Sequence, residues 1–129
     1  MTSAWPTELR LKRAERLLEI AFDDGKRFRL PAEYLRVESP SAEVQGHGPG
    51  QKQLVAGRAG IGIAAIEPVG NYAVRLVFED GHDTGIYSWT YLYELGTEQD
   101  QRWRTYLAAL ERAGLSRESS PKRSRPAAP

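Results

Sequence analysis

The sequence contains no cysteine, and this absence removes several kinds of chemistry at once. Disulfide bonds, thiolate metal ligands and cysteine nucleophiles are all excluded. Histidine is scarce as well, because the 129 residues include only two, His47 and His82. Any chemistry that needs an imidazole therefore depends on these two positions.

Long apolar runs and a charge excess are also missing. No apolar stretch approaches the roughly 20 residues that a membrane-spanning helix needs, and residues 1–11 lack the apolar run of a signal peptide. The formal net charge is +1, which gives no strong attraction to nucleic acid or to an anionic membrane. We therefore expect a cytoplasmic protein with no membrane segment and no nucleic-acid partner.

The composition, 40% apolar and 27% charged, is typical of a soluble protein with a single modest core. Beyond residue 115 there is no large apolar side chain, so burial cannot offset the entropy of ordering that segment. We expect one domain over residues 1–114, followed by a disordered basic tail over residues 115–129 that carries Lys122, Arg123 and Arg125.

Alternating apolar and polar residues predict strands in the first two thirds of the chain. The expected strands are 9–12, 17–22, 28–30, 61–66 and 72–78. In the last of these, Tyr72 is expected to face inward together with Val74, Leu76 and Phe78.

The last third of the sequence predicts helices. Ser88 can cap a helix over residues 89–95, which Gly96 is expected to end. A second helix is expected to begin at Thr97 and to end at Gly114. Its apolar residues form one stripe at helical spacing: Trp103, Tyr106, Leu107 and Leu110.

Residues 18–25 and 74–81 share one pattern. Each is an apolar strand ending in an acidic residue and glycine, a combination that suits a tight hairpin turn. Each is followed by a return strand and a short helix with a Tyr-Leu pair. This predicts an α+β fold, an antiparallel β-rich domain of two hairpin–helix modules with a C-terminal helix. Between the modules, the glycine- and proline-rich residues 38–59 predict an exposed loop.

Five motifs stand out in the ordered part: 30–36 (LPAEYLR), 39–44 (SPSAEV), 46–51 (GHGPGQ), 67–72 (EPVGNY) and 81–89 (GHDTGIYSW). Together, over roughly residues 7–96, they resemble the gamma-butyrobetaine hydroxylase N-terminal domain-like family. Its bacterial form is a small stand-alone domain of unknown function.

The resemblance implies a binding role rather than catalysis. In the longer hydroxylases a similar domain precedes an iron- and 2-oxoglutarate-dependent catalytic domain, which this sequence does not contain. Similar domains are also appended to P-loop ATPases that carry iron–sulfur clusters. We therefore expect a non-catalytic binding or accessory module, with a protein partner among iron–sulfur carrier or assembly proteins.

The resemblance also bears on metal binding. Hydroxylases of the family hold a structural zinc with a Cys-Pro-Cys-x-x-Cys run and a later histidine. By position these ligands correspond to Ser39, Ser41, Val44 and His82 in this sequence. Because serine is a poor zinc ligand and valine cannot be one, tight tetrahedral zinc is not expected.

Two roles remain open for His82. It can form local hydrogen bonds just after a turn, as a partly exposed side chain. Alternatively, it can be one ligand of a weaker zinc or iron site, with His47 and Glu43 supplied by the glycine-rich loop. In that case Asp83 would orient the imidazole. The alternative function is thus a small metal-binding protein.

Catalytic patterns are weak. His82, Asp83 and Ser88 are the residue types of a hydrolase triad, but Ser88 is better explained as a helix cap and no Gly-x-Ser-x-Gly sequence is present. The remaining acidic pairs, at 23–24 and 79–80, occupy turns, where carboxylates are common.

Overall fold

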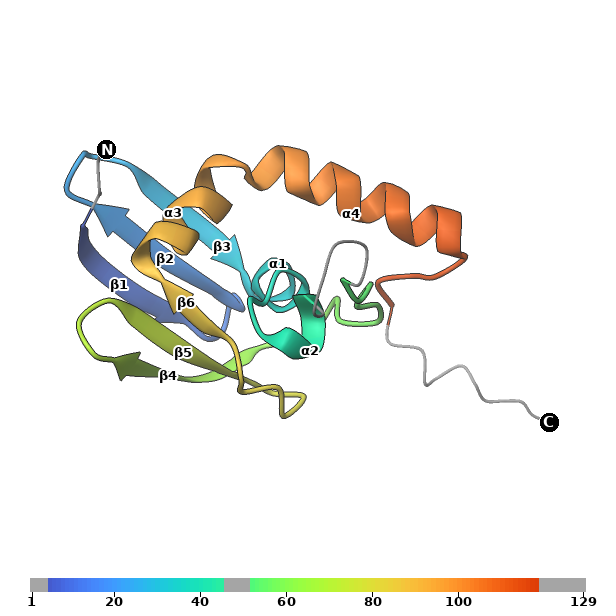
Figure 1. The fold of residues 1–129 in the computed structure, drawn as a ribbon, viewed down its shortest axis with the longest axis horizontal. Coiled ribbons are helices and arrows are strands. Elements are labelled where there is room, and N and C mark those ends of the chain that lie inside the picture. Colours follow the sequence, from blue (N-terminus) through green and yellow to red (C-terminus); the bar gives the residue numbers. More distant parts are fainter. Residues whose placement is uncertain (1–4, 46–51, 119–129) are drawn as a thin grey trace.

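The computed structural model describes residues 5–45 and 52–118, apart from the side chain of Glu43. It confirms the predicted α+β class, with two three-stranded antiparallel sheets and helices that cover them (Figure 1). The first sheet contains β1 (Pro6–Lys12), β2 (Leu17–Phe22) and β3 (Arg27–Pro31), and the second contains β4 (Ile63–Val69), β5 (Ala73–Phe78) and β6 (Ile86–Ser88). The helices are α1 (Ala32–Val37), α2 (Ala42–Gln45), α3 (Trp89–Thr97) and α4 (Gln99–Ala113).

The sequence pattern shared by residues 18–25 and 74–81 forms two turns of the same geometry. Gly25 follows β2 with φ +90°, and Gly81 follows β5 with φ +92°, a region in which glycine has no steric penalty. Each glycine N–H donates to a phenylalanine carbonyl three residues back, at 3.0 Å in both turns. The two hairpin–helix modules predicted from the sequence are therefore present.

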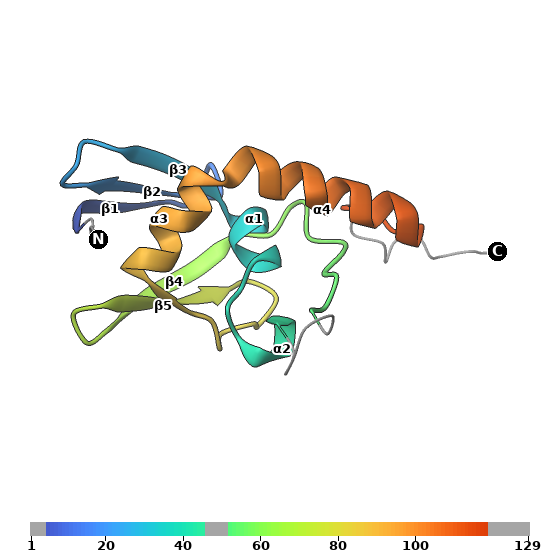
Figure 2. The ribbon, with the colours of Figure 1, turned by 45° about the horizontal axis from the view of Figure 1, so that its top comes forward.

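The two sheets share one core, closed on one side by α1 and α3 (Figures 1 and 2). Large side chains from both sheets and both helices are almost fully buried in it. Each contributes roughly 1.5–3 kcal/mol relative to exposure. They include Leu18, Ile20, Leu30, Leu35, Leu76, Phe78, Leu92 and Leu95. Neither sheet encloses these side chains by itself, so the modules stabilise each other.

Helix α4 lies beside this core and forms a second, smaller apolar cluster with Val37 of α1. Tyr106 and Leu110 are buried there, and Trp103 packs against them. Leu107, which the sequence placed in the same stripe, is 39% exposed. The helix ends at Gly114 in the left-handed conformation, as predicted.

The boundary between α3 and α4 differs from the prediction. Gly96 lies inside α3, which continues to Thr97, and α4 begins at Gln99. A Cβ atom at Gly96 would lie 2.3 Å from the Phe28 ring, so this glycine permits close packing of α3 on β3. Thr97 donates its hydroxyl to the carbonyl of Tyr93 instead of capping a new helix.

Tyr72 was wrongly expected to face inward. It precedes β5 in the turn after β4 and is 56% exposed. The strand predicted from residue 61 begins at Ile63 and extends through Pro68, which is tolerated because β4 is an edge strand.

The segment expected to be an exposed loop is partly ordered and buried. Residues 42–45 form one helical turn, α2, and Ser39, Ser41 and Val44 are buried. Ser116 and Arg117 form hydrogen bonds with the body of the domain, and the expected tail beyond residue 118 lies outside the described residues. Among the helices that the structure describes, none combines the length and the apolar character needed to cross a membrane.

Replacing Gly96 by alanine is expected to lower the free energy of unfolding by about 1–3 kcal/mol, because the added methyl group overlaps the Phe28 ring. Gly60→Ala is the matched control, since its Cβ would meet nothing within 4 Å. Urea denaturation of both variants measures the difference. Equal stabilities would contradict the close packing of α3 on β3.

Candidate functional site

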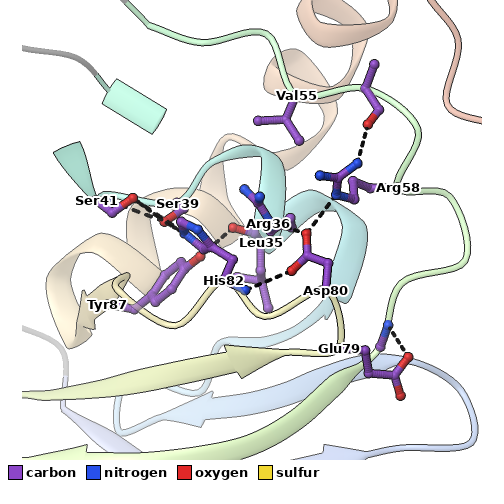
Figure 3. A network of polar contacts seen from close by, with 12 residues as sticks. Leu35, Arg36, Ser39, Ser41, Val55, Arg58, Glu79, Asp80, His82 and Tyr87 are labelled. Atoms are coloured by element: carbon purple, nitrogen blue, oxygen red, sulfur yellow. Dashed lines mark hydrogen bonds and ion pairs between the residues drawn. The ribbon is translucent and has the colours of Figure 1, made fainter. Parts of the chain in front are cut away.

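A buried polar cluster joins the end of α1 to the turn after β5 (Figure 3). It consists of Ser39, Ser41 and His82, which we call the serine–histidine cluster. All three residues are buried, and Ser39 is completely inaccessible to solvent. The Nε2 atom of His82 lies 2.9 Å from Ser39 Oγ and 3.4 Å from Ser41 Oγ. One of the two roles left open for His82 had its side chain partly exposed, whereas the structure buries it.

Local backbone geometry brings these residues together. His82 follows the turn at Gly81, and its N–H donates to the Asp80 carboxylate at 3.0 Å. On the other side, the chain approaches Ser39 at Gly85, where a Cβ atom would lie 2.6 Å from Ser39 Oγ. Glycine at position 85 therefore allows the turn to lie against the end of α1.

Two tyrosines bordering the cluster are unsuited to proton transfer. The hydroxyl of Tyr87 donates to the Leu35 carbonyl, and burial raises its pKa far above the ordinary value. Tyr91 donates to the Glu38 carbonyl at 2.6 Å, and burial raises its pKa to about 12. Both phenols stay protonated at neutral pH and serve as donors to backbone carbonyls.

Asp80 connects the cluster to two arginines. Its Oδ2 atom accepts from Arg36 at 2.9 Å and from Arg58 at 2.7 Å. Burial by itself would raise the pKa of this carboxyl. The hydrogen bonds from the His82 N–H and from both arginines outweigh that effect, so the pKa lies below the ordinary value. The Nη1 atom of Arg36 is buried and has no hydrogen-bond partner within the described residues.

The donor set of the serine–histidine cluster does not fit a structural zinc ion. Two of the positions carry neutral hydroxyls, and both lie within hydrogen-bonding distance of the imidazole Nε2. The fourth position is Val44, a buried apolar side chain that offers no donor atom. The structure thus brings three of the four family positions together as a hydrogen-bonded group.

The weaker metal site stays a prediction. His47 and the side chain of Glu43 lie outside the described residues, so their distances from His82 are not given by the structure. Within residues 5–45 and 52–118, no three His, Asp or Glu side chains are grouped to hold a metal ion. The Asp83 carboxylate lies 3.5 Å from the Arg75 guanidinium, whose Nη1 also donates to the Asp83 carbonyl.

The other catalytic candidates have structural roles. The Ser88 hydroxyl accepts from the Tyr91 N–H at 3.1 Å, which confirms it as the cap of α3. Asp24 accepts hydrogen bonds from the Lys26 N–H and the Tyr93 hydroxyl in the first hairpin turn.

A groove runs along α4, and it was not predicted from the sequence. It has a volume of about 410 Å³, and we call it the α4 groove. One wall is a face of α4, and the other is formed by the end of α1 and the segment 52–54. Its lining residues are Val37, Glu38, Lys52, Gln53, Leu54, Glu98, Gln101, Arg102, Thr105, Tyr106 and Ala109.

A buried carboxylate organises one end of the groove. Glu38 is 4% exposed and accepts from Lys52 at 2.9 Å and from Arg102 at 3.0 Å. Arg102 also binds Glu98, the residue just before α4, and Glu94 of α3. The four-residue spacing of Glu98 and Arg102 is a sequence signal for part of this arrangement, because residues four apart share a helical face. Nothing in that spacing indicated Glu38.

The fold defines a small α+β domain of two hairpin–helix modules, and the comparisons with known proteins give its family. The model of the gamma-butyrobetaine hydroxylase-like N-terminal domain matches residues 9–93, which is more than half of the sequence. The chain therefore belongs to that family. No curated protein matches it.

Similar solved structures include the following three. Two are solution structures determined by NMR. One is 42% identical with a TM-score of 0.81, and the match covers 98% of this chain and 100% of the other. The second is 54% identical with a TM-score of 0.77, covering 91% and 90%. The third is the crystal structure of a DUF971-family protein of unknown function from Acidithiobacillus ferrooxidans, 41% identical with a TM-score of 0.60, covering 70% and 91%.

Replacing Ser39 by alanine is expected to lower the free energy of unfolding by about 1–3 kcal/mol, because the buried His82 Nε2 loses its nearer hydroxyl partner. Ser41→Ala is the comparison, since its hydroxyl is 3.4 Å away and its loss should cost less. Chemical denaturation provides the measurement. A larger loss for Ser41→Ala would contradict the assigned contacts.

Asp80→Asn is expected to destabilise the fold by about 2–4 kcal/mol at pH 7, because two arginines lose their shared carboxylate. The folded-state pKa of Asp80 is lowered, so its contribution is present above the unfolded pKa of about 3.9 and is lost as the pH falls through the lower folded-state value. The difference between the proteins should therefore shrink below about pH 4.

Denaturation curves from pH 3 to pH 7 test this dependence. Asp83→Asn serves as the control, since its carboxylate is half exposed and pairs with a partly exposed arginine. We expect less than about 1 kcal/mol for that variant. A pH-independent difference for Asp80→Asn would refute the ionic role of Asp80.

Proposed function

We propose that the protein is a non-catalytic binding module whose α4 groove takes a short segment of a partner protein. The observation that carries this proposal is the groove itself, a concave surface of about 410 Å³ with apolar and charged parts. Its volume lies in the range of surfaces that enclose small ligands or a few side chains, roughly 300–1,000 Å³.

The two ends of the groove differ in chemistry, and this difference defines the occupant. One end carries Lys52, Glu98 and Arg102 around the buried Glu38. The other end is formed by Leu54, Tyr106 and Ala109, next to the small apolar cluster of α4. An occupant that fits both ends has a large apolar side chain at one end and polar or charged groups at the other.

The length of the groove supports a peptide segment. Its helical wall runs from Glu98 to Ala109, which at 1.5 Å per residue is about 16 Å. About five residues of extended chain span this distance. The mixed charges of Lys52 and Glu98, both nearly half exposed, favour a segment of low net charge.

The burial of the polar side chains and their hydrogen bonds within the fold support a non-catalytic role. Ser39 and Tyr87 are inaccessible to solvent and form hydrogen bonds within the fold. A nucleophile or general acid needs contact with a substrate. In this domain, these residues connect elements of the fold.

The partner class follows from the family resemblance. Similar domains occur with ATPases that carry iron–sulfur clusters, so the proposed partners are iron–sulfur carrier or assembly proteins in the cytoplasm. The segment that binds would be a short amphipathic stretch on the surface of such a protein.

Ala109→Arg is expected to weaken binding at least roughly tenfold, because a long charged side chain enters the apolar end of the groove. Seven-residue peptides are first selected from a displayed random library and from the sequences of iron–sulfur carrier proteins. Their affinities for the wild type and the variant are then measured by fluorescence anisotropy.

Leu107→Arg is the matched control, since it adds the same side chain to an exposed position of α4 outside the groove lining. Selected peptides should bind this control as they bind the wild type. Peptides that bind all three proteins equally, or a selection that yields no binder, would refute the groove as the docking site. Selection from the random library alone would support the groove and refute the iron–sulfur partner.

A further inference from the structure

The chain after α4 turns back onto the body of the domain. Gly114, with φ +71°, ends the helix, and the Leu115 N–H donates to the Leu110 carbonyl at 2.9 Å. Two backbone hydrogen bonds then join the next residues to a distant segment. Gly57 N–H donates to the Ser116 carbonyl and Ala59 N–H to the Arg117 carbonyl, both at 2.9 Å.

The side chain of Arg117 fixes this arrangement. Its Nε and Nη2 atoms donate to the two carboxylate oxygens of Glu33 at 2.8 Å and 2.7 Å. Such a two-point pair is among the stronger and more directional polar contacts in proteins. Glu33 is 5% exposed, and a buried carboxylate needs a partner that offsets the cost of its desolvation. The guanidinium also lies 5.4 Å from the centre of the Trp103 ring on α4.

The segment held by these contacts continues the wall of the α4 groove. Residues 52–56 form neither helix nor strand, so a regular hydrogen-bond ladder does not fix them. The segment is attached at separate points: Gln53 N–H donates to the Val44 carbonyl, and the Val55 carbonyl accepts from the Tyr106 hydroxyl. The Arg58 guanidinium adds hydrogen bonds to the Asp80 carboxylate and to the Ala56 carbonyl. The contacts of Gly57 and Ala59 with residues 116–117 are further attachments.

We propose that residues 115–118 form a C-terminal latch and that Arg117 is a positioning residue for the α4 groove. By fixing residues 57 and 59, the latch holds the adjoining groove wall at 52–56 in one conformation. A wall that is already ordered loses less conformational entropy when a segment binds. Opening the latch therefore lowers the affinity of the groove. This proposal rests on the proposed binding function for its effect on affinity, but the latch can be measured without any partner.

The first test is amide hydrogen exchange followed by NMR on the whole chain. In Arg117→Ala, the amides of Gly57 and Ala59 are expected to exchange at least roughly tenfold faster, because their acceptors are no longer held in place. The amides of Val74 and Leu76 in the central strand β5 should keep their protection, which shows that the change is local. Arg112→Ala, an exposed arginine in the last turn of α4, is the matched control and should leave all four amides unchanged.

The second test is the affinity of peptides selected for the groove. Arg117→Ala should weaken their binding by roughly tenfold, the cost of ordering about one residue of backbone. Arg112→Ala should bind them as the wild type does. Arg117→Lys keeps the charge but loses the two-point contact, so it should lie between the wild type and Arg117→Ala.

The outcomes separate the latch from the groove. Unchanged exchange of Gly57 and Ala59 in Arg117→Ala would refute the latch, whether or not any peptide binds. Faster exchange with unchanged peptide affinity would refute the positioning role and leave the groove intact. If the wild type binds no peptide, the binding function fails and with it the positioning role, while the latch is still decided by exchange. If Arg117→Ala does not fold, the double variant Glu33→Gln/Arg117→Ala removes the unpaired buried charge and is used in its place.

Discussion

The two three-stranded sheets of this domain depend on each other because neither can bury its own apolar face. Isolated three-stranded sheets of this size have little core, and here β2 and β5 both place fully buried side chains in one shared interior. Helix α3 closes the open side of that interior, with Leu92 and Leu95 inaccessible to solvent. The ends of α1 and β5, which carry the polar contacts, extend from this common core.

Polar contacts at one end of the core position residues that lie at the surface. The serine–histidine cluster and the pair of Arg36 with Asp80 join the end of α1 to the turn after β5. The same end of α1 carries Val37 and Glu38 into the α4 groove. The groove therefore depends on buried contacts that are not part of its own surface. In the positions that correspond to the zinc ligands of family hydroxylases, hydrogen bonds of Ser39 and Ser41 with His82 make the connection.

Much of the secondary structure could be predicted because local signals agree with the tertiary contacts. The acidic-glycine turns at Gly25 and Gly81 are examples, since the positive φ angle is a property of the turn itself. Gly96 was misread as a helix end because its role depends on Phe28, far away in the sequence. Tyr72 was misread because alternation cannot tell the last residue of a turn from the first residue of a strand.

Local residue patterns were enough to predict the hairpins, the capped helix α3, the glycine end of α4 and the family. These follow from contacts within a few residues or from motifs in linear order. In contrast, the packing of distant segments brings Glu38, Lys52 and Arg102 together in one groove and returns Arg117 to Glu33. Such ion pairs join residues up to 84 positions apart. Their formation depends on how the modules pack, and local residue patterns carry no information about that packing.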